Sequence, residues 1–163
     1  MKIKLVMFKE DDPRKCTAIK LIRFKLANKT KKTNYRSLIL DPFAKKILSP
    51  VDKHVKSITA IDCSWNKINP VSIKRFIGMH RKLPPLYAGN PVNYSKLNKL
   101  TTVEAIAAAL FILGDVKNGK IIMSKFKWGH SFIELNYNLL NDYSKSKSPK
   151  EINDIVNEYG IIV

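Results

Sequence analysis

The sequence predicts an α/β fold, with a mainly parallel sheet flanked by helices and a helical C-terminal third. Three observations lead to this prediction. Short β-type runs alternate with helical spacing along the first two thirds of the chain, which is typical of a parallel sheet. A polar loop at 89–100 leads directly into a helix from about residue 102. Further helical patterns then follow near 117–126, 130–143 and 149–158.

The first strand is expected at residues 2–8, where KIKLVMF alternates and then becomes continuously apolar. Asp12-Pro13 interrupts the chain before helical spacing begins, and that spacing extends from Cys16 to Leu26. The run SLIL at 37–40 predicts a second strand, which ends at Asp41-Pro42.

Residues 48–55, LSPVDKHV, indicate a helix start, because Ser49 can cap the helix and Pro50 suits its first position. The β-rich run SITAIDCSW at 57–65 predicts another strand. A short helix is expected within 69–79, and LPPLYAG at 83–89 forms either a short strand or an extended loop. With 163 residues, 45% of them hydrophobic, the chain should form a single compact unit.

The charge of the chain is strongly unbalanced, with 30 basic and 13 acidic residues and a net charge of +17. Such an excess favours a polyanionic partner, above all nucleic acid. The alternative is a general bias towards lysine, which accompanies the many Ile and Asn residues. The basic residues concentrate in two groups, at 14–36 and 74–82.

Several classes of function are disfavoured. The two cysteines and three histidines are isolated in the sequence, so neither a metal site nor a disulfide is expected. The six glycines form no phosphate-binding motif, which argues against nucleoside triphosphatases and Rossmann enzymes. No stretch approaches the roughly 18 apolar residues of a membrane span. The first residues resemble a strand more than a signal peptide, so a cytoplasmic protein is expected.

The helix start in LTTVEAIAAAL, residues 100–110, is a candidate ligand site. Thr101 and Glu104 form a capping box, which fixes where the helix begins. Free N–H groups at a helix start attract a carboxylate or phosphate, and the alanines leave room for close approach. The alternative is a buried helix whose small residues serve tight packing.

A second candidate is AIDCSW at 60–65, where Asp62 follows an apolar strand and precedes Trp65. Ligands of open α/β sheets gather at the carboxyl ends of strands. A carboxylate and an indole face both suit a cation such as a sulfonium. Alternatively, Asp62 caps the next turn and Trp65 belongs to the core. Thr17 is a third candidate, either as a ligand-binding hydroxyl and N–H or as an ordinary helix cap.

Five stretches in this order resemble the rRNA aminocarboxypropyltransferases, which modify small-subunit rRNA during ribosome biogenesis. They are DPRKCTAIKL (12–21), LSPVD (48–52), IDCSW (61–65), GNPVNYSKLNKLTTVEAIAAAL (89–110) and SKFKWGHSFIELN (124–136). The resemblance implies a SPOUT-like fold with a trefoil knot in its C-terminal part. It divides the unit into an N-terminal α/β part with a basic face, about 1–60, and a cofactor-binding knotted part, about 61–163.

The resemblance implies that S-adenosylmethionine donates its 3-amino-3-carboxypropyl group to N3 of a uridine or N1-methylpseudouridine. Thr17 and Thr102 would hold the amino-acid carboxylate, and the Ile61 carbonyl would accept the ribose hydroxyls. Leu83 and the main chain at Asn98 would bind the adenine edge. The remaining cofactor residues would be the pocket walls Leu48, Leu100 and Ala105, and Trp65 against the methionine part. Asp62 would lie beside the reacting centre as a base or as an orienting group.

The partner implied is small-subunit rRNA or the pre-ribosomal small subunit, bound by a monomer. The expected RNA contacts are Arg14, Lys15, Lys20, Arg23, Lys29, Lys31, Lys32, Lys74, Arg75 and Arg81. The sequence departs from the family at Ser95, at Asn98 and in KLPPLYAGN (82–90). The alternatives are a SPOUT rRNA methyltransferase and a non-catalytic RNA-binding assembly factor.

Overall fold

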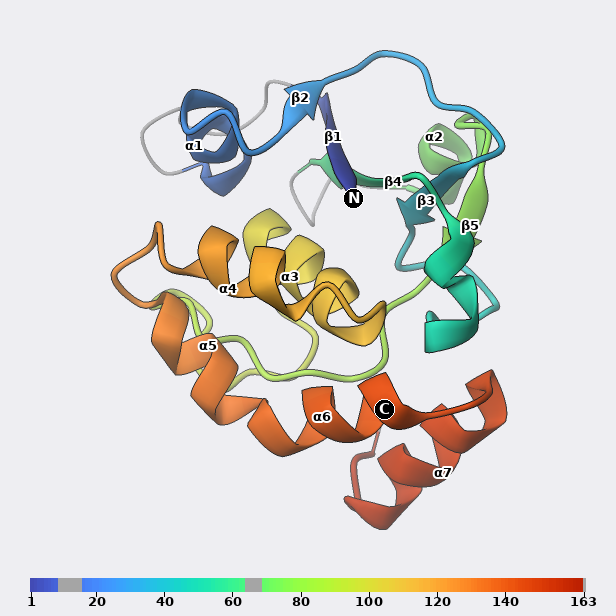
Figure 1. Cartoon of the computed structure of the whole chain (residues 1–163), viewed down its shortest axis with the longest axis vertical. Coiled ribbons are helices and arrows are strands. Elements are labelled where there is room, and N and C mark those ends of the chain that lie inside the picture. The colour runs from blue at the N-terminus through green and yellow to red at the C-terminus, as the bar shows by residue number, and fades with distance from the viewer. Residues whose placement is uncertain (9–15, 64–68, 163) are drawn as a thin grey trace.

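The computed structural model describes residues 1–8, 16–63 and 69–162, in which five strands form one parallel sheet (Figure 1). The strand order is β2-β1-β4-β3-β5. The strands are β1 (Lys2–Met7), β2 (Asn28–Lys29), β3 (Ser37–Leu40), β4 (Ser57–Asp62) and β5 (Met79–Arg81). The prediction of a parallel α/β sheet is confirmed.

Strand β4 is at the centre of the sheet and pairs with β1 along its full length, from Lys2 opposite Ser57 to Met7 opposite Asp62. All four residues of β3 are buried, as expected for a parallel strand covered on both faces. Because every pairing is parallel, the carboxyl ends of β1, β3 and β4 point the same way. Asp62 is therefore placed at a common edge of the sheet.

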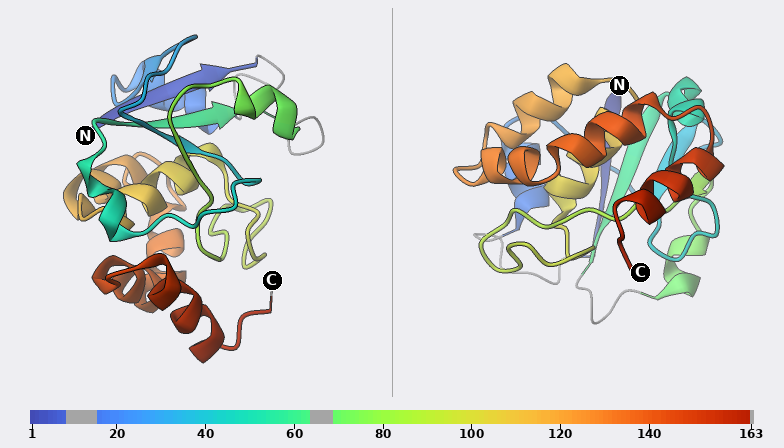
Figure 2. Two further views of the ribbon diagram at one scale, coloured as in Figure 1. Left: turned by 90° about the vertical axis from the view of Figure 1, so that its right-hand side faces the viewer. Right: turned by 90° about the horizontal axis from the view of Figure 1, so that it is seen from below.

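Helices α3 to α7 lie on one side of the sheet, with α3 nearest to the strands and α7 farthest from them (Figure 2). They are α3 (Thr102–Ile112), α4 (Val116–Met123), α5 (Gly129–Leu135), α6 (Tyr137–Lys145) and α7 (Pro149–Glu158). Helix α1 (Thr17–Arg23) flanks the β2 edge and contacts α3. On the opposite face, α2 (Pro70–Lys74) covers a small cluster of Val6, Ile39, Ile73 and Phe76.

Helix α3 is buried almost all round, which explains its small side chains. Ala107, Ala108 and Ala109 are fully buried between the sheet and the outer helices. The neighbouring helix α4 approaches so closely that a Cβ on Gly119 would come within 2.8 Å of the Phe111 ring. Tight packing, which was the alternative interpretation of this helix, is therefore present, and only its first turn is open to a ligand.

Several predicted boundaries were wrong for identifiable reasons. The helix predicted at 16–26 ends at Arg23, because Lys25 adopts a left-handed conformation with φ of 58°. The pattern at 130–143 is two helices, which meet at Asn136. The start at Ser49 leads into a short 3₁₀ helix, η1 (Pro50–His54). For residues 83–89 the extended-loop alternative holds, because they form no strand and make a single bridge, between Tyr87 and Leu97.

Strands β2 and β5 were not predicted because they have only two and three residues and lie at the sheet edges. Such short, partly exposed runs carry no periodic signal. Across the described ranges, no helix is both long and apolar enough to cross a membrane.

Candidate functional site

A pocket of about 500 Å³ lies between the carboxyl ends of β3 and β4 and the start of α3. We call it the strand-end pocket. Its size is within the usual range for small-ligand sites. The residues that line it are Leu40, Asp41, Pro42, Ile47, Ala60, Ile61, Cys63, Lys82, Leu83, Pro85, Asn98, Lys99, Leu100, Thr101, Thr102, Ala105, Asn153 and Val156.

Six of the predicted cofactor residues line this pocket, although they come from three separate parts of the sequence. They are Ile61, Leu83, Asn98, Leu100, Thr102 and Ala105. Leu48 is fully buried in the core, next to the lining residue Ile47. Asp62 does not line the pocket but accepts a hydrogen bond from the lining residue Thr102. Thr17 is bonded to Val103, in the first turn of α3, and Trp65 lies outside the described residues.

Asp62 is the centre of a polar network that joins three elements. Its Oδ1 accepts a hydrogen bond from the Thr102 hydroxyl at 2.8 Å, and its Oδ2 accepts one from the Cys16 thiol at 3.1 Å. The hydroxyl of Thr17 accepts a hydrogen bond from the Val103 N–H at 3.4 Å. The ends of α1, β4 and α3 are thus held together, and the predicted residues Thr17, Asp62 and Thr102 converge.

The Cys16 thiol acts as a neutral donor in this network. Its pKa is raised to about 11, mainly by burial, with a further contribution from the Asp62 carboxylate and an opposing one from the Ile19 N–H. The thiol therefore keeps its proton at neutral pH and offers it to Asp62. Cys16 also caps α1, since its sulfur accepts a hydrogen bond from the Ile19 N–H at 3.4 Å.

The start of α3 provides an anion site at one end of the pocket. Thr101 and Glu104 form the predicted capping box, which is confirmed. The Thr102 N–H has no hydrogen-bond partner in the described part of the chain. It therefore remains available to a ligand carboxylate, which the helix dipole also favours.

The carboxylate of Glu104 holds the loop that forms one pocket wall. It is fully buried and accepts five hydrogen bonds, from the Gly89 N–H, from the N–H and side-chain amide of Asn90, and from the N–H and hydroxyl of Thr101. Both ends of the loop at 89–101 therefore meet on one side chain. Sequence reasoning had identified Glu104 only as a helix cap.

Asn98, one of the departures from the family pattern, has a local structural role. Its backbone is left-handed with φ of 59°, a conformation that Asn adopts more readily than most residues. Its N–H donates to the Leu86 carbonyl at 2.8 Å, while its side-chain oxygen accepts from the Leu86 N–H at 3.3 Å. The pocket wall is therefore closed here by backbone pairing.

Four polar lining residues were missed, namely Asp41, Lys82, Lys99 and Asn153, and two of them show why. Asp41 is buried at the end of β3, where it contacts His80 Nδ1 at 2.9 Å and accepts a hydrogen bond from the Phe43 N–H. Its place after an apolar run was a signal, because ligands gather at strand ends. Asn153 comes from α7 and had no local signal, since only the fold brings α7 to the pocket.

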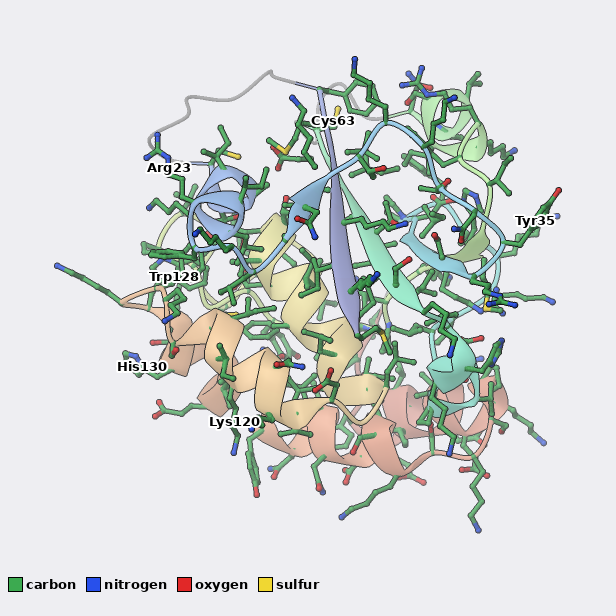
Figure 3. All side chains as sticks on the ribbon, turned by 45° about the horizontal axis from the view of Figure 1, so that its top comes forward. Arg23, Tyr35, Cys63, Lys120, Trp128 and His130 are labelled. Carbon is green, nitrogen blue, oxygen red and sulfur yellow. The ribbon has the colours of Figure 1, made fainter. Side chains whose placement is uncertain are left out.

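The predicted RNA contacts separate into groups. Lys29, Lys31, Lys32 and Arg75 line one hollow. Lys20 and Arg23 are on α1, and Figure 3 shows Arg23 far from Tyr35 across the molecule. Arg81 is 17% exposed and makes a two-pronged ion pair with Asp52. Lys74 is exposed and stands apart from these groups. Arg14 and Lys15 lie outside the described ranges.

No group of three or more His, Cys, Asp or Glu side chains that could hold a metal occurs in residues 1–8, 16–63 and 69–162. A pocket at the ends of parallel strands, a free helix start beside it and a strongly basic composition define the class. It is that of α/β proteins that bind a small anionic or zwitterionic ligand and associate with a polyanion.

Comparisons with known proteins agree with this class. Residues 38–160 match the family described as "Ribosome biogenesis protein, C-terminal". The chain is 49% identical over 156 residues to the 16S rRNA aminocarboxypropyltransferase of Methanococcoides burtonii, covering 93% of this chain and 90% of that protein. It is 42% identical over 161 residues to the enzyme of the same name from Sulfurisphaera tokodaii, covering 97% and 95%.

A solved structure, that of the SAM-dependent rRNA:acp-transferase Tsr3 from Vulcanisaeta distributa, has a TM-score of 0.85 and 34% identity, covering 98% of this chain and 89% of that one. The chain belongs to the 16S rRNA aminocarboxypropyltransferase family.

Residues 1–33 also match a family described as "Possible Fer4-like domain in RNase L inhibitor, RLI". Iron–sulfur clusters are held by several cysteine thiolates, commonly four. This segment contains one cysteine, Cys16, whose thiol is engaged with Asp62. The residues present therefore do not fit a cluster.

Proposed function

We propose that this chain transfers the 3-amino-3-carboxypropyl group of S-adenosylmethionine to small-subunit rRNA. Its curated relatives carry the name of this activity and cover nearly the whole chain. The single observation that carries the proposal is the strand-end pocket, which brings six predicted cofactor residues together beside Asp62 and the free start of α3.

The pocket fits a long ligand with an apolar end and a zwitterionic end. Leu83 and Leu100 line one part, where the adenine would lie, with the main chain at Asn98 facing its polar edge. The Ile61 carbonyl would accept the ribose hydroxyls. Thr102 lies at the other end, where its N–H, which no described residue accepts, suits the amino-acid carboxylate. Leu48, Ala105 and Thr17 would support the walls of the pocket, and Trp65 would pack on the methionine part.

The sulfonium of S-adenosylmethionine activates the γ-carbon of the amino-acid chain towards a nucleophile. The protein decides which activated carbon is presented, and near in-line placement of the acceptor favours transfer. The acceptor proposed is N3 of a uridine or N1-methylpseudouridine. As N3 bonds to the γ-carbon, the bond from that carbon to sulfur breaks and releases the neutral thioether 5′-methylthioadenosine. N3 loses its proton in this step, so a nearby base assists.

Asp62 is the proposed group at the reacting centre. In the described part of the chain, each of its oxygens accepts one hydrogen bond, which leaves a second lone pair that can accept a proton. The bonds from Thr102 and Cys16 fix its orientation. Asp62 therefore serves either as the base or as the group that orients the sulfonium.

We also propose that the chain acts as a cytoplasmic monomer and that its C-terminal part, about 61–163, forms a trefoil knot. A basic N-terminal part, about 1–60, would present the RNA-binding surface. The structural similarity over 98% of the chain to a transferase of the same family supports this arrangement. Size-exclusion chromatography with light scattering tests the monomer directly.

The experiment is nucleoside analysis of small-subunit rRNA after incubation with the protein and S-adenosylmethionine. We expect a uridine-derived nucleoside that carries an aminocarboxypropyl group on N3. A methylated nucleoside would favour the methyltransferase alternative. If calorimetry detects no binding of S-adenosylmethionine, the assembly-factor alternative holds. Trp65→Ala should weaken that binding strongly, and unchanged affinity would remove Trp65 from the site.

A further inference from the structure

A second hollow, of about 750 Å³, lies on the face of the sheet opposite α3. We call it the basic hollow. Lys29 is the last residue of β2, and the segment after it contributes Lys31 and Lys32. Arg75 and Phe76 follow α2, and Phe8 follows β1. Figure 1 shows the segment after β2 arching over the sheet towards α2. Residues nearly 50 positions apart in the sequence thus form one surface.

Among the residues that the structure describes, no acidic side chain balances the positive charge of the basic hollow. None of the described residues that line it is acidic, and the ion pairs found in the described ranges involve Met1, His80 and Arg81 instead. Lys29, Lys31, Lys32 and Arg75 are all exposed. Four cations around one concave surface attract an extended polyanion.

The hollow also offers flat surfaces. The guanidinium of Arg75 lies 5.3 Å from the centroid of the Phe8 ring and 5.0 Å from that of Phe76. These two contacts hold the guanidinium plane in place beside the lysines. A held guanidinium plane is a surface on which unpaired bases stack, whereas phosphate alone requires no such plane.

The basic hollow lies close to the proposed reaction centre. The Phe8 N–H donates to the Asp62 carbonyl at 3.2 Å, so the rim of the hollow is joined to the end of β4. Ile61 lines the strand-end pocket and also packs against the small core cluster that contains Phe76. One strand end therefore separates the two cavities.

We propose that the basic hollow binds single-stranded RNA next to the target nucleotide, stacking one unpaired base on Arg75 and holding the adjacent phosphates with Lys29, Lys31 and Lys32. This inference rests on the proposed function. The nucleotides that flank the target would then lie on the face of the sheet opposite the strand-end pocket. The RNA would pass over the end of β4 to reach both cavities.

The test is fluorescence anisotropy with a short labelled oligouridylate over a series of salt concentrations, repeated with the same strand paired to oligoadenylate. The variants are Lys31→Ala with Lys32→Ala, Arg75→Ala and Arg75→Lys. The matched control is Lys117→Ala with Lys120→Ala, which removes two exposed lysines from α4, on the other side of the sheet. Figure 3 shows Lys120 directed away from the strands.

We expect the double lysine variant to reduce the slope of log affinity against log salt by about 1.4, or roughly 0.7 for each lost phosphate contact. Arg75→Ala should weaken single-strand binding about tenfold, as for the loss of one stacked base. Arg75→Lys should retain the salt slope but not the affinity, because lysine keeps the charge and lacks the plane. These effects should be small for the duplex.

The inference is overturned if the double lysine and Arg75 variants bind the single strand like the control, or if Arg75→Lys binds like the wild type. Crosslinking with oligouridylate that contains 4-thiouridine gives a second measurement, in which adducts should map to the segments 29–33 and 75–77. Affinity for S-adenosylmethionine should be unchanged in every variant. If the wild type binds the single strand but transfers no aminocarboxypropyl group to rRNA, the proposed function is rejected and the RNA-binding inference stands.

Discussion

Replacing Glu104 by Gln tests how the pocket wall is held. Five donors converge on this buried carboxylate, and they come from both ends of the loop at 89–101. In glutamine one of the two oxygens becomes an NH₂ group. If it replaces Oε1, it faces the N–H groups of Gly89 and Asn90, and if it replaces Oε2, it faces the Asn90 amide and the Thr101 N–H.

In either orientation at least two donors lose their acceptor in a site without access to water. Each unsatisfied buried donor costs about 1–3 kcal/mol, so we expect a loss of about 4 kcal/mol. For a chain of this length, that loss lowers the melting temperature by roughly 8–16 °C. Because the loop carries Asn98 and Leu100, affinity for S-adenosylmethionine should fall as well.

The assay is urea unfolding followed by circular dichroism, with Glu151→Gln as the matched control. Glu151 is also near a helix start, but the hydrogen bond that it accepts, from the Lys147 N–H at 2.7 Å, is exposed. Its replacement should cost about 0.5–1 kcal/mol. If Glu104→Gln costs no more than Glu151→Gln, the carboxylate does not anchor the loop.

Three further changes test other parts of the account. Because burial raises the pKa of the Cys16 thiol from 9.0 to about 11, the folded state keeps a proton that the unfolded state has lost. Between about pH 9 and 11, the free energy of unfolding of the wild type should therefore fall by about 2 kcal/mol more than that of Cys16→Ser. Urea titration at each pH measures both, and parallel pH profiles would contradict the prediction. Thr102→Val removes the hydroxyl that orients Asp62 and should weaken binding of S-adenosylmethionine about tenfold by calorimetry, as for one hydrogen bond to a charged group; unchanged affinity would separate Thr102 from the site. Gly89→Ala places a Cβ 2.5 Å from the backbone of Phe132 and should cost about 2–4 kcal/mol in thermal melts, by overpacking. The control is Gly114→Ala, because a Cβ there meets no atom within 4 Å and carries only the strain of a positive φ. It should cost about 1 kcal/mol, and equal losses of stability for the two glycines would refute the steric argument.

The parts of the fold that were predicted are those with a strong local signal. The capping box fixed the start of α3, because Thr101 and Glu104 act on the adjacent turn. The apolar run before Asp62 predicted β4, and the carboxyl-end rule then placed Asp62 at the edge of the sheet. Strands β2 and β5 were beyond such reasoning, because each pairs with a neighbour through only two or three residues.

The candidate site depends on contacts between distant segments, which periodicity does not reveal. Thr17 was a candidate only as a possible cap or ligand, and its actual partner is the first turn of α3, 86 residues away. Asn153 reaches the pocket because α7 folds back over it. Glu104 combines both cases, since its cap was local but its bonds to Gly89 and Asn90 are formed by a loop that returns on itself.

The most direct test of the proposed function uses two preparations of S-adenosylmethionine, one labelled in the methyl group and the other in the carboxyl of the amino-acid part. Each is incubated with the protein and small-subunit rRNA, and label in the RNA is counted. We expect transfer from the carboxyl-labelled preparation alone. Transfer from the methyl-labelled preparation alone would contradict it, because the pocket would then present a different carbon to the RNA.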